Sequence, residues 1–340
     1  MDVEFAGDGT PVTYKLNRSR ETWKSPPNAP GRRCIVFYAR SDSSVAIRDP
    51  LKSDVTLHLR PEEILNGSRR TAAVTCNGLI ADWVKWQDRQ SEQFFALTKA
   101  LETLSPGPDE LIRPGKAVRT AIRDVRDIPT VQLDYGLVPI THASAGMRRV
   151  ISFAWLLIWA VYEHRFLATQ LHESPIQDVV ILFDEVEAHL HPRWQRAFIP
   201  SLLTVMKMLL ADVNPRIQFI VTTHSPLVLA SVEPTFDESL DSLHSFHLHR
   251  GKITVQHEHW AKQGDASNWL VSSVFGLHQA RSKEAEIAIE AAEAFMRRDL
   301  RSLPPTLNTK EAIHRELQRV LASHDAFWPR WIVKGMELVK

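Results

Sequence analysis

The chain has 340 residues, of which 41 are Lys or Arg and 40 are Asp or Glu, and its formal net charge is +1. This length can bury a large core, whereas the balanced charge excludes a general attraction to nucleic acid or to a membrane surface. The two cysteines, Cys34 and Cys76, have no metal-ligand spacing and suit a reducing compartment. The longest apolar stretch, residues 150–162, is shorter than the roughly 20 residues of a membrane helix. We therefore expect a cytoplasmic protein without a membrane span.

Residues 1–60 are predicted to form a segment of antiparallel strands. Apolar and polar residues alternate there in short runs, and stretches rich in glycine or proline separate the runs. The expected strands are residues 3–5, 12–16, 34–38 and 45–47, and the expected turns are residues 7–9 and 26–31.

Residues 78–140 are predicted to form a helical lobe. Apolar residues recur at helical spacing over residues 79–104, and the sequence Ser-Pro-Gly-Pro then ends the pattern. We expect a second, shorter helix over residues 118–128 and an extended segment over residues 129–139.

Residues 141–260 are predicted to form an α/β core, because helical and strand patterns alternate as in a parallel sheet with covering helices. Residues 261–340 are expected to be a helical tail, with residues 285–298 as its clearest helix. In the core, helices are expected at residues 144–170 and 194–210, strands at residues 179–183 and 217–223, and a β-hairpin at residues 243–258.

Five apolar residues, Val179 to Phe183, lead directly into two adjacent acids, Asp184 and Glu185. A buried strand delivers carboxylates to the edge of a parallel sheet in this way, and the arrangement is that of a Walker B motif. In such a motif Asp184 would hold magnesium through its water shell, and Glu185 would take a proton from the attacking water. The alternative interpretation is that both acids only cap the following helix.

His224 follows the second predicted strand of the core and precedes Ser225 and Pro226. From this position an imidazole can hydrogen-bond a γ-phosphate and the catalytic glutamate, so that it senses the bound nucleotide. A lone histidine is more often a surface residue or a satisfied core residue. The company of Asp184 and Glu185 favours the functional interpretation.

Ser144, Ala145 and Gly146 open the long apolar helix of the core. The backbone N–H groups and the positive dipole end of a helix start form an anion site, to which the Ser144 hydroxyl adds a donor. Ser144 also suits the N-cap position, and the two interpretations are compatible.

Three segments together resemble the motifs of SMC-like and RecF-like ABC ATPases. Residues 144–149 resemble the signature motif, residues 182–192 resemble Walker B and the D-loop, and residues 222–226 resemble the switch-histidine segment. More narrowly, they are similar to bacterial AAA-type ATP-binding proteins that include the OLD family and the Septu-type PtuA defence ATPases. The match covers residues 140–231 and implies a P-loop NTPase head of the ABC type, with ATP and Mg²⁺ as cofactors.

In that family two heads enclose two ATP molecules. By the resemblance, Ser144 and Gly146 contact the γ-phosphate that is bound to the opposite head. Asp184 is implied to hold magnesium, Glu185 to act as the base and His224 to act as the switch, while the loop after Walker B contacts the other head.

One element of the family pattern is not found, since residues 1–140 contain no Walker A loop, G-x-x-x-x-G-K-[ST]. The sequence Pro114-Gly115-Lys116-Ala117 has a Gly-Lys pair, and we expect it to be a loop. In the family the Walker A loop precedes the β-rich segment. We therefore expect an incomplete head, through truncation, a split gene or true loss, and feeble ATP binding by the isolated chain.

Two functions of different classes follow. The first is an ATPase whose head dimerises around nucleotide, with itself or with another ABC-type head, and so controls a separate nuclease or toxin effector in antiphage defence or DNA repair. The second is a non-catalytic interaction subunit that cannot bind ATP alone because Walker A is absent. Nucleic-acid binding is unsupported, because acids alternate with the basic residues of the tail, Arg281, Lys283, Arg297, Arg298 and Arg301.

Overall fold

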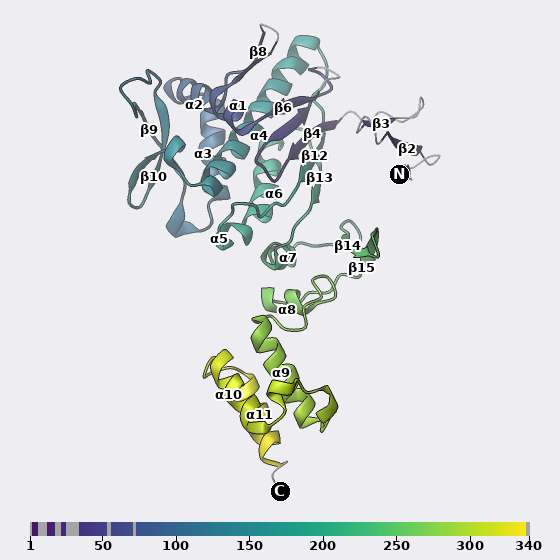
Figure 1. Ribbon diagram of the computed structural model, residues 1–340. Helices are drawn as coiled ribbons and strands as arrows, with labels where there is room; N and C mark the ends of the chain where they lie inside the picture. Colours follow the sequence, from purple (N-terminus) through teal and green to yellow (C-terminus); the bar gives the residue numbers. More distant parts are fainter. Residues whose placement is uncertain are drawn as a thin grey trace. The chain divides into compact units, whose positions relative to one another are not determined.

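In the computed structural model, the described residues are 2–5, 12–17, 22–24, 34–52, 56–70 and 73–337. The chain divides into two compact units, Met1–Thr223 and His224–Lys340 (Figure 1). The limits of the four regions expected from the sequence remain predictions.

The first unit begins with an antiparallel sheet of three strands, which confirms the strands expected at residues 3–5 and 12–16. The turns expected at residues 7–9 and 26–31 lie outside the described residues. The three strands are β1 (Asp2–Phe5), β2 (Val12–Asn17) and β3 (Thr22–Lys24).

A five-stranded sheet forms the centre of the first unit, in the order β13-β12-β4-β5-β6. Strand β12 (Asp178–Phe183) pairs in parallel with both β13 (Arg216–Val221) and β4 (Cys34–Ala39). On the other side of β4 follow the antiparallel strands β5 (Val45–Arg48) and β6 (Leu57–Leu59). The mixed α/β fold with a parallel core is thus confirmed.

The register of this sheet brings three strand ends together. Phe183 pairs with Val221 of β13 and with Ala39 of β4, so the chain leaves all three strands at one edge. The Phe183 ring also packs against Phe153 and Phe198, with centroid distances of 4.8 and 5.7 Å. Helices α4 (Ala145–Leu171) and α6 (Phe198–Leu209) therefore cover the same face of β12.

Helix α4 is the core helix of the first unit. The Ser144 hydroxyl accepts from the Met147 N–H at its start, and His172 ends it with a left-handed φ of 56°. By length and composition α4 is apolar enough to cross a membrane, but 67% of its most apolar window is buried inside the protein. Its apolar surface therefore serves the protein core.

After β6 come α1 (Pro61–Asn66) and the hairpin of β7 (Ser68–Arg70) and β8 (Ala73–Cys76). The expected lobe, residues 78–140, then begins with α2 (Leu79–Asp88) and α3 (Glu92–Leu104). The prediction of a single helix over residues 79–104 is wrong, because the helix is interrupted between α2 and α3. Gln90 has a φ of 48°, and the Ser91 hydroxyl then caps a new helix. A left-handed residue followed by an N-cap interrupts the helix without interrupting the apolar pattern.

Two further expectations for the lobe are wrong, because this part of the chain folds as an antiparallel sheet of β9 (Arg113–Val118), β10 (Ile128–Leu133) and β11 (Gly136–Pro139). Residues 119–127 contain no helix, and Gly115 and Lys116 lie in a strand instead of a loop. A Cβ at Gly115 would lie 2.4 Å from Thr130 Oγ1, so close strand packing explains this glycine. The expected extended segment over residues 129–139 is confirmed as β10 and β11.

The helix expected over residues 194–210 is split into α5 (Pro192–Gln195) and α6. In the second unit, α7 (Pro226–Val232) and α8 (Ala266–Val271) flank the expected hairpin of β14 (Leu243–His249) and β15 (Lys252–Glu258). A small core of Leu229, Trp260 and Trp269 holds this part together.

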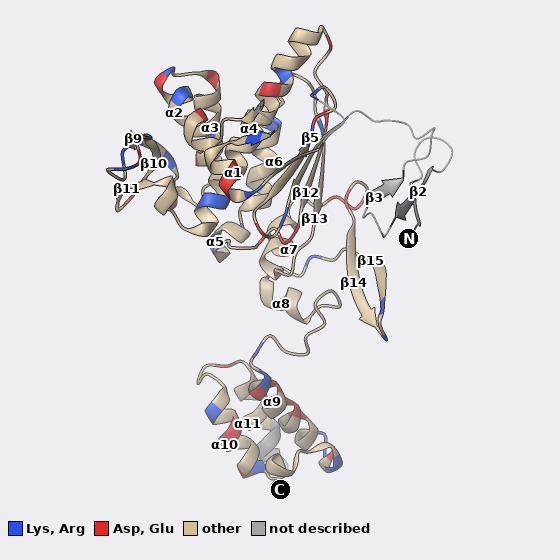
Figure 2. Ribbon diagram, turned by 45° about the horizontal axis from the view of Figure 1, so that its top comes forward, with Lys and Arg blue, Asp and Glu red and all other residues tan. Residues whose placement is uncertain are grey.

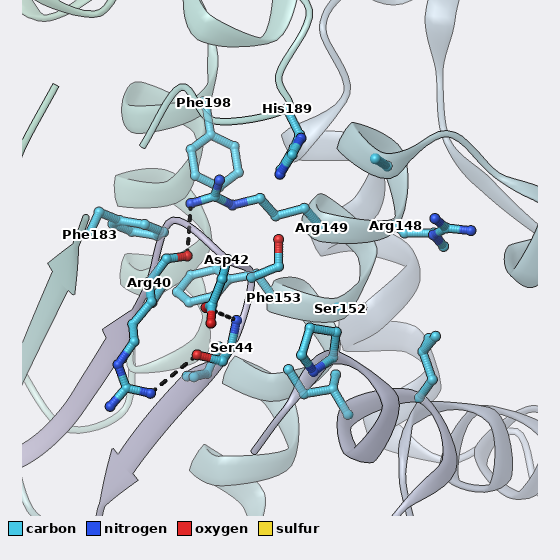
Figure 3. Close-up of a pocket in the computed structure, with 17 residues that line it drawn as sticks. Arg40, Asp42, Ser44, Arg148, Arg149, Ser152, Phe153, Phe183, His189 and Phe198 are labelled. Atoms are coloured by element: carbon cyan, nitrogen blue, oxygen red, sulfur yellow. Dashed lines mark hydrogen bonds between the residues drawn. The ribbon is translucent and has the colours of Figure 1, made fainter. Parts of the chain in front are cut away.

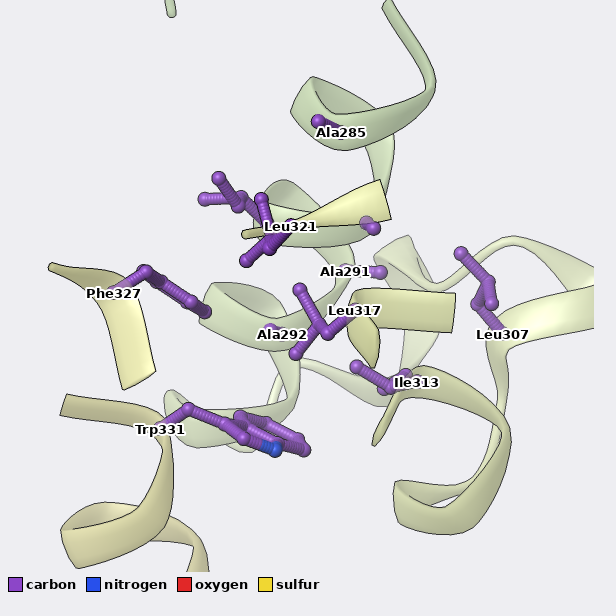
Figure 4. Packing of buried hydrophobic residues seen from close by; sticks show 11 residues of the cluster. Ala285, Ala291, Ala292, Leu307, Ile313, Leu317, Leu321, Phe327 and Trp331 are labelled. Carbon is purple, nitrogen blue, oxygen red and sulfur yellow. The ribbon is translucent and has the colours of Figure 1, made fainter. Parts of the chain in front are cut away.

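The chain ends in three helices, α9 (Lys283–Met296), α10 (Lys310–Val320) and α11 (Phe327–Glu337). Their buried faces share a core that includes Ala292, Leu317 and Trp331 (Figure 4). Acidic and basic residues both occur along these helices (Figure 2). Arg281 pairs with Asp325 at 2.8 Å, and Arg330 pairs with Glu293 at 2.8 Å, so neighbouring acids balance part of the basic charge.

Candidate functional site

The two acids of the predicted Walker B motif lie at the common edge of the parallel strands. The Asp184 N–H donates to the Ala39 carbonyl at 2.9 Å, which continues the pairing of β12 and β4 by one residue. Asp184 is half-buried and Glu185 is exposed. Neither acid caps a helix, since the next helix, α5, begins at Pro192 and has His191 as its N-cap.

Thr222, the first residue after β13, connects both acids to that strand. Its hydroxyl donates to Asp184 Oδ1 at 2.9 Å and accepts from the Glu185 N–H at 2.9 Å. The Thr222 N–H in turn donates to the Phe183 carbonyl at 2.9 Å. Thr222 is thus a site residue that the motifs did not single out, although the parallel pairing of the two strands places it beside Asp184.

Two residues of the loop 184–190 have a left-handed backbone. Glu185 has a φ of 47° and His189 a φ of 64°, a conformation that is uncommon for residues other than glycine. Hydrogen bonds to the two residues after β13 hold this loop in place. The Thr223 hydroxyl donates to Glu187 Oε2 at 2.6 Å, and the Val186 N–H donates to the Thr222 carbonyl at 3.2 Å.

The predicted signature segment lies against the same loop. Ser144 is exposed, as an anion contact requires, and its hydroxyl caps α4 by accepting from the Met147 N–H at 3.2 Å. Gly146 is buried, and a Cβ there would lie 2.3 Å from the His189 carbonyl oxygen. Gly146 thus permits close packing of the helix start on the loop, whatever it contributes to an anion site.

Arg149 adds a second link between α4 and the loop. Its guanidinium donates to the carbonyls of Ala188 at 2.7 Å, Glu185 at 3.3 Å and Arg40 at 3.4 Å. Burial lowers the pKa of Arg149, and the nearby carboxylates of Glu187, Glu185, Asp184 and Asp42 act in the opposite direction. Arg149 lies in the predicted signature segment, residues 144–149, but its contacts could not be read from the motif.

A cavity of about 190 Å³ lies between the end of β4 and the start of α4. Figure 3 shows the Arg149 side chain beside Phe198 and its bond to the Arg40 carbonyl. Two hydrogen bonds from Ser44 and the charges of Arg40 and Arg149 lower the pKa of Asp42. Arg149 is thus the central cation among several carboxylates.

The donor set at the sheet edge suits magnesium, which prefers carboxylate and water oxygens. Asp184 Oδ1 accepts from Thr222, and no described residue donates to Asp184 Oδ2. Among the described residues, no group of three or more metal-binding side chains occurs. A magnesium ion at Asp184 would therefore keep most of its ligands as water or phosphate oxygens.

His224 is the first residue of the second unit and follows the last residue of β13 by two threonines. The Ser225 hydroxyl accepts from the Leu227 N–H at 3.2 Å and caps α7, so the chain turns directly after the histidine. The switch role of His224 remains a prediction.

Residues 38–230 match the family described as "AAA domain, putative AbiEii toxin, Type IV TA system". The matched segment extends from the end of β4 through the acids, Thr222 and most of α7. The chain belongs to this family. The match confirms the expected resemblance to an ATPase with a P-loop NTPase head.

Three curated relatives are similar to parts of this chain. The Retron Vc95 probable ATPase of Vibrio cholerae serotype O1 biovar El Tor is 41% identical over 136 residues, which are 36% of this chain and 24% of the relative. The Retron Ec83 probable ATPase of Escherichia coli is 32% identical over 100 residues, which are 29% of this chain and 15% of the relative. The Septu protein PtuA of Bacillus mycoides strain KBAB4 is 44% identical over 50 residues, which are 15% of this chain and 6% of the relative. The matched segments thus span a quarter of these relatives or less. Their similarity supports the ABC-type, PtuA-like assignment made from the motifs.

Two solved structures resemble part of this chain weakly. One belongs to work on ATP-driven dimerization and DNA-stimulated activation of SMC ATPases (15% identical; 52% of this chain, 88% of that chain; TM-score 0.31). The other is the Smc head domain of Pyrococcus furiosus with an extended coiled coil, bound to the C-terminal domain of ScpA (16%; 48% and 35%; TM-score 0.29). At these TM-scores the two structures add nothing to the assignment.

Proposed function

We propose that this chain supplies the hydrolytic residues of an ABC-type ATPase head, in which Asp184 would hold magnesium through its water shell and Glu185 would act as the general base. The main observation in support is the Thr222 hydroxyl, which forms hydrogen bonds with Asp184 Oδ1 and with the Glu185 N–H at the edge where two parallel strands end. When bound, magnesium and ATP supply the reacting phosphoryl group and the neutralisation of its charge. The exposed Glu185 carboxylate accepts the proton of the attacking water.

The proposal extends to an assembly of two heads, by the family resemblance. Ser144 and Gly146 contact the γ-phosphate held by the opposite head, and His224 reports which nucleotide is bound. Head dimerisation in the cytoplasm then controls a separate effector in antiphage defence.

The test is the variant Glu185→Gln, which keeps the shape of the side chain and removes the base. We expect ATP turnover to fall by about 10²–10⁴-fold while nucleotide binding is retained, because the base acts only in the reaction step. The control is Glu290→Gln on α9, which changes an exposed acid of the second unit in the same way. Unchanged turnover in Glu185→Gln would remove Glu185 from the mechanism.

A second candidate function is a non-catalytic interaction subunit. The observation that favours it is the place of Gly115 and Lys116 within β9, where the backbone pairs with β10 and cannot cradle a phosphate. Isothermal titration of the chain with Mg-ATP separates the two functions. A Kd near 1 μM, about −8 kcal/mol, would exclude the second candidate, whereas undetectable binding would support it.

A further inference from the structure

The start of α4 and the loop 184–190 are joined at two independent places. Gly146 is so close to the His189 carbonyl that even a methyl group would overlap with it, at 2.3 Å. One turn further along the helix, Arg149 donates to the carbonyls of Ala188 and Glu185. Any displacement of the helix start therefore acts on the loop directly.

The backbone of Glu185 is held on both sides of its Cα. Its N–H donates to Thr222 Oγ1 at 2.9 Å, and its carbonyl accepts from Arg149 at 3.3 Å. Glu185 is also one of the residues with a left-handed φ, which persists where surrounding contacts determine it. The direction of the Glu185 carboxylate thus depends on a bond from α4, the helix that Ser144 caps.

We propose that Arg149 is a positioning residue that couples the anion-binding start of α4 to the base, Glu185. This inference rests on the proposed function and names the device that regulates the same site. When the opposite head brings a phosphate to Ser144, the helix start and the loop respond as one body. The base is then aligned for its own nucleotide only after the two heads have met.

A guanidinium suits this role better than an ammonium. Its planar fork reaches carbonyls of two separate segments at once, the turn after β4 at Arg40 and the loop at Ala188 and Glu185. A lysine in the same place keeps the charge among the surrounding acids but has a single nitrogen. Arg149→Lys therefore tests whether the loop depends on the hydrogen-bond geometry of the guanidinium or only on its positive charge.

The experiment compares Arg149→Lys and Arg149→Ala with Arg165→Ala. Arg165 lies on the same helix and donates to the Leu209 carbonyl at 2.7 Å, at the other end of α4, so it is a matched control. Hydrogen exchange of the full chain without nucleotide should be at least about tenfold faster for the amides of residues 184–190 in both Arg149 variants, because local opening costs less there. The control should leave that exchange unchanged.

Steady-state kinetics provides the second readout. Both Arg149 variants should lower kcat for ATP by at least about tenfold with little change in KM, because only the alignment of the base is lost. Equal loop exchange in Arg149→Ala and Arg165→Ala would overturn the inference, as would full kcat in the Arg149 variants of an active protein. Absence of turnover in the unchanged protein would instead refute the proposed function, and the exchange experiment would still decide whether Arg149 holds the loop.

Discussion

Thr222 Oγ1 donates to Asp184 Oδ1 over 2.9 Å, although the two residues are 38 positions apart in the chain. The same oxygen accepts from the Glu185 N–H at 2.9 Å, so both the donor and the acceptor capacity of the hydroxyl are used. The contact exists because β12 and β13 end in register, at Phe183 and Val221. One hydroxyl therefore orients the carboxylate that is proposed to hold magnesium and the backbone of the proposed base.

The variant Thr222→Val keeps the shape of the side chain and removes both hydrogen bonds. We expect ATP turnover to fall by about 10- to 100-fold, because losing two bonds of about 1 kcal/mol each lets Asp184 and Glu185 leave their aligned positions. Thr222→Ser restores the hydroxyl and should recover most of the turnover. The measurement is the steady-state rate of ATP hydrolysis by the unchanged protein, Thr222→Val and Thr222→Ser.

A control for this change is Thr204→Val, since the Thr204 hydroxyl donates only within α6, to the Pro200 carbonyl at 3.1 Å. It should leave turnover unaltered. If Thr222→Val hydrolyses ATP as fast as the unchanged protein, then the hydroxyl does not position the acids.

Continuous apolar runs and capping residues were enough to predict the strand of Asp184 and the helix of Ser144. Val179, Ile181 and Phe183 are buried on one face of β12, and Ser144 caps α4 as its sequence context indicates. These features are local, and the chain encodes them within a few residues.

The contacts of Thr222 and Arg149 could not be predicted in the same way. Both depend on the register between segments that are distant in the chain, and side-chain pattern alone does not fix that register. The strand at Gly115 was missed for a related reason. A Pro-Gly pair signals a turn locally, but pairing with β10 and packing on Thr130 override that signal.

The close approach of Gly146 to His189 leads to a stability prediction. Gly146→Ala should lower the free energy of unfolding by about 1–3 kcal/mol, because its Cβ would overlap with a backbone oxygen that the loop cannot easily move. Gly107→Ala is the matched control, since a Cβ there meets nothing within 4 Å. Urea denaturation measures both variants, and an equal stability of the two would contradict the packing argument.

His164 and Asp49 form a buried pair that ties α4 to the residue after β5. His164 Nδ1 lies 3.1 Å from both Asp49 oxygens, and the Ile176 N–H donates to His164 Nε2 at 2.9 Å. The ring nitrogen toward Asp49 therefore carries the proton. His164→Ala leaves a buried carboxylate and an N–H without this partner, and should cost about 3–5 kcal/mol of unfolding free energy.

The control for His164→Ala is His142→Ala, which removes an exposed imidazole from the same unit. Its effect on the unfolding free energy should stay within about 0.5 kcal/mol. The two variants are compared by chemical denaturation at one pH. A cost for His164→Ala as small as that of the control would show that the buried pair contributes little to stability.

Asp82 on α2 makes stability depend on pH. Its side chain is buried, with 4% of the residue exposed, and burial raises its pKa, while a hydrogen bond from Asn77 at 3.1 Å acts in the opposite direction. Between the unfolded pKa, about 3.9, and the raised folded pKa, the folded state binds more protons than the unfolded state. The contribution of Asp82 to the unfolding free energy therefore falls as the pH rises through this window, and the penalty is complete above it.

Asp82→Asn keeps an acceptor for Asn77 and removes the charge, so it should be more stable than the unchanged protein at pH 7 and lose this advantage as the pH approaches 4. Asp88→Asn, an exposed position on the same helix, should show no such pH-dependent gain. Urea denaturation over this pH range makes the comparison, and a gain for Asp82→Asn that grows toward low pH would contradict the sign derived from burial.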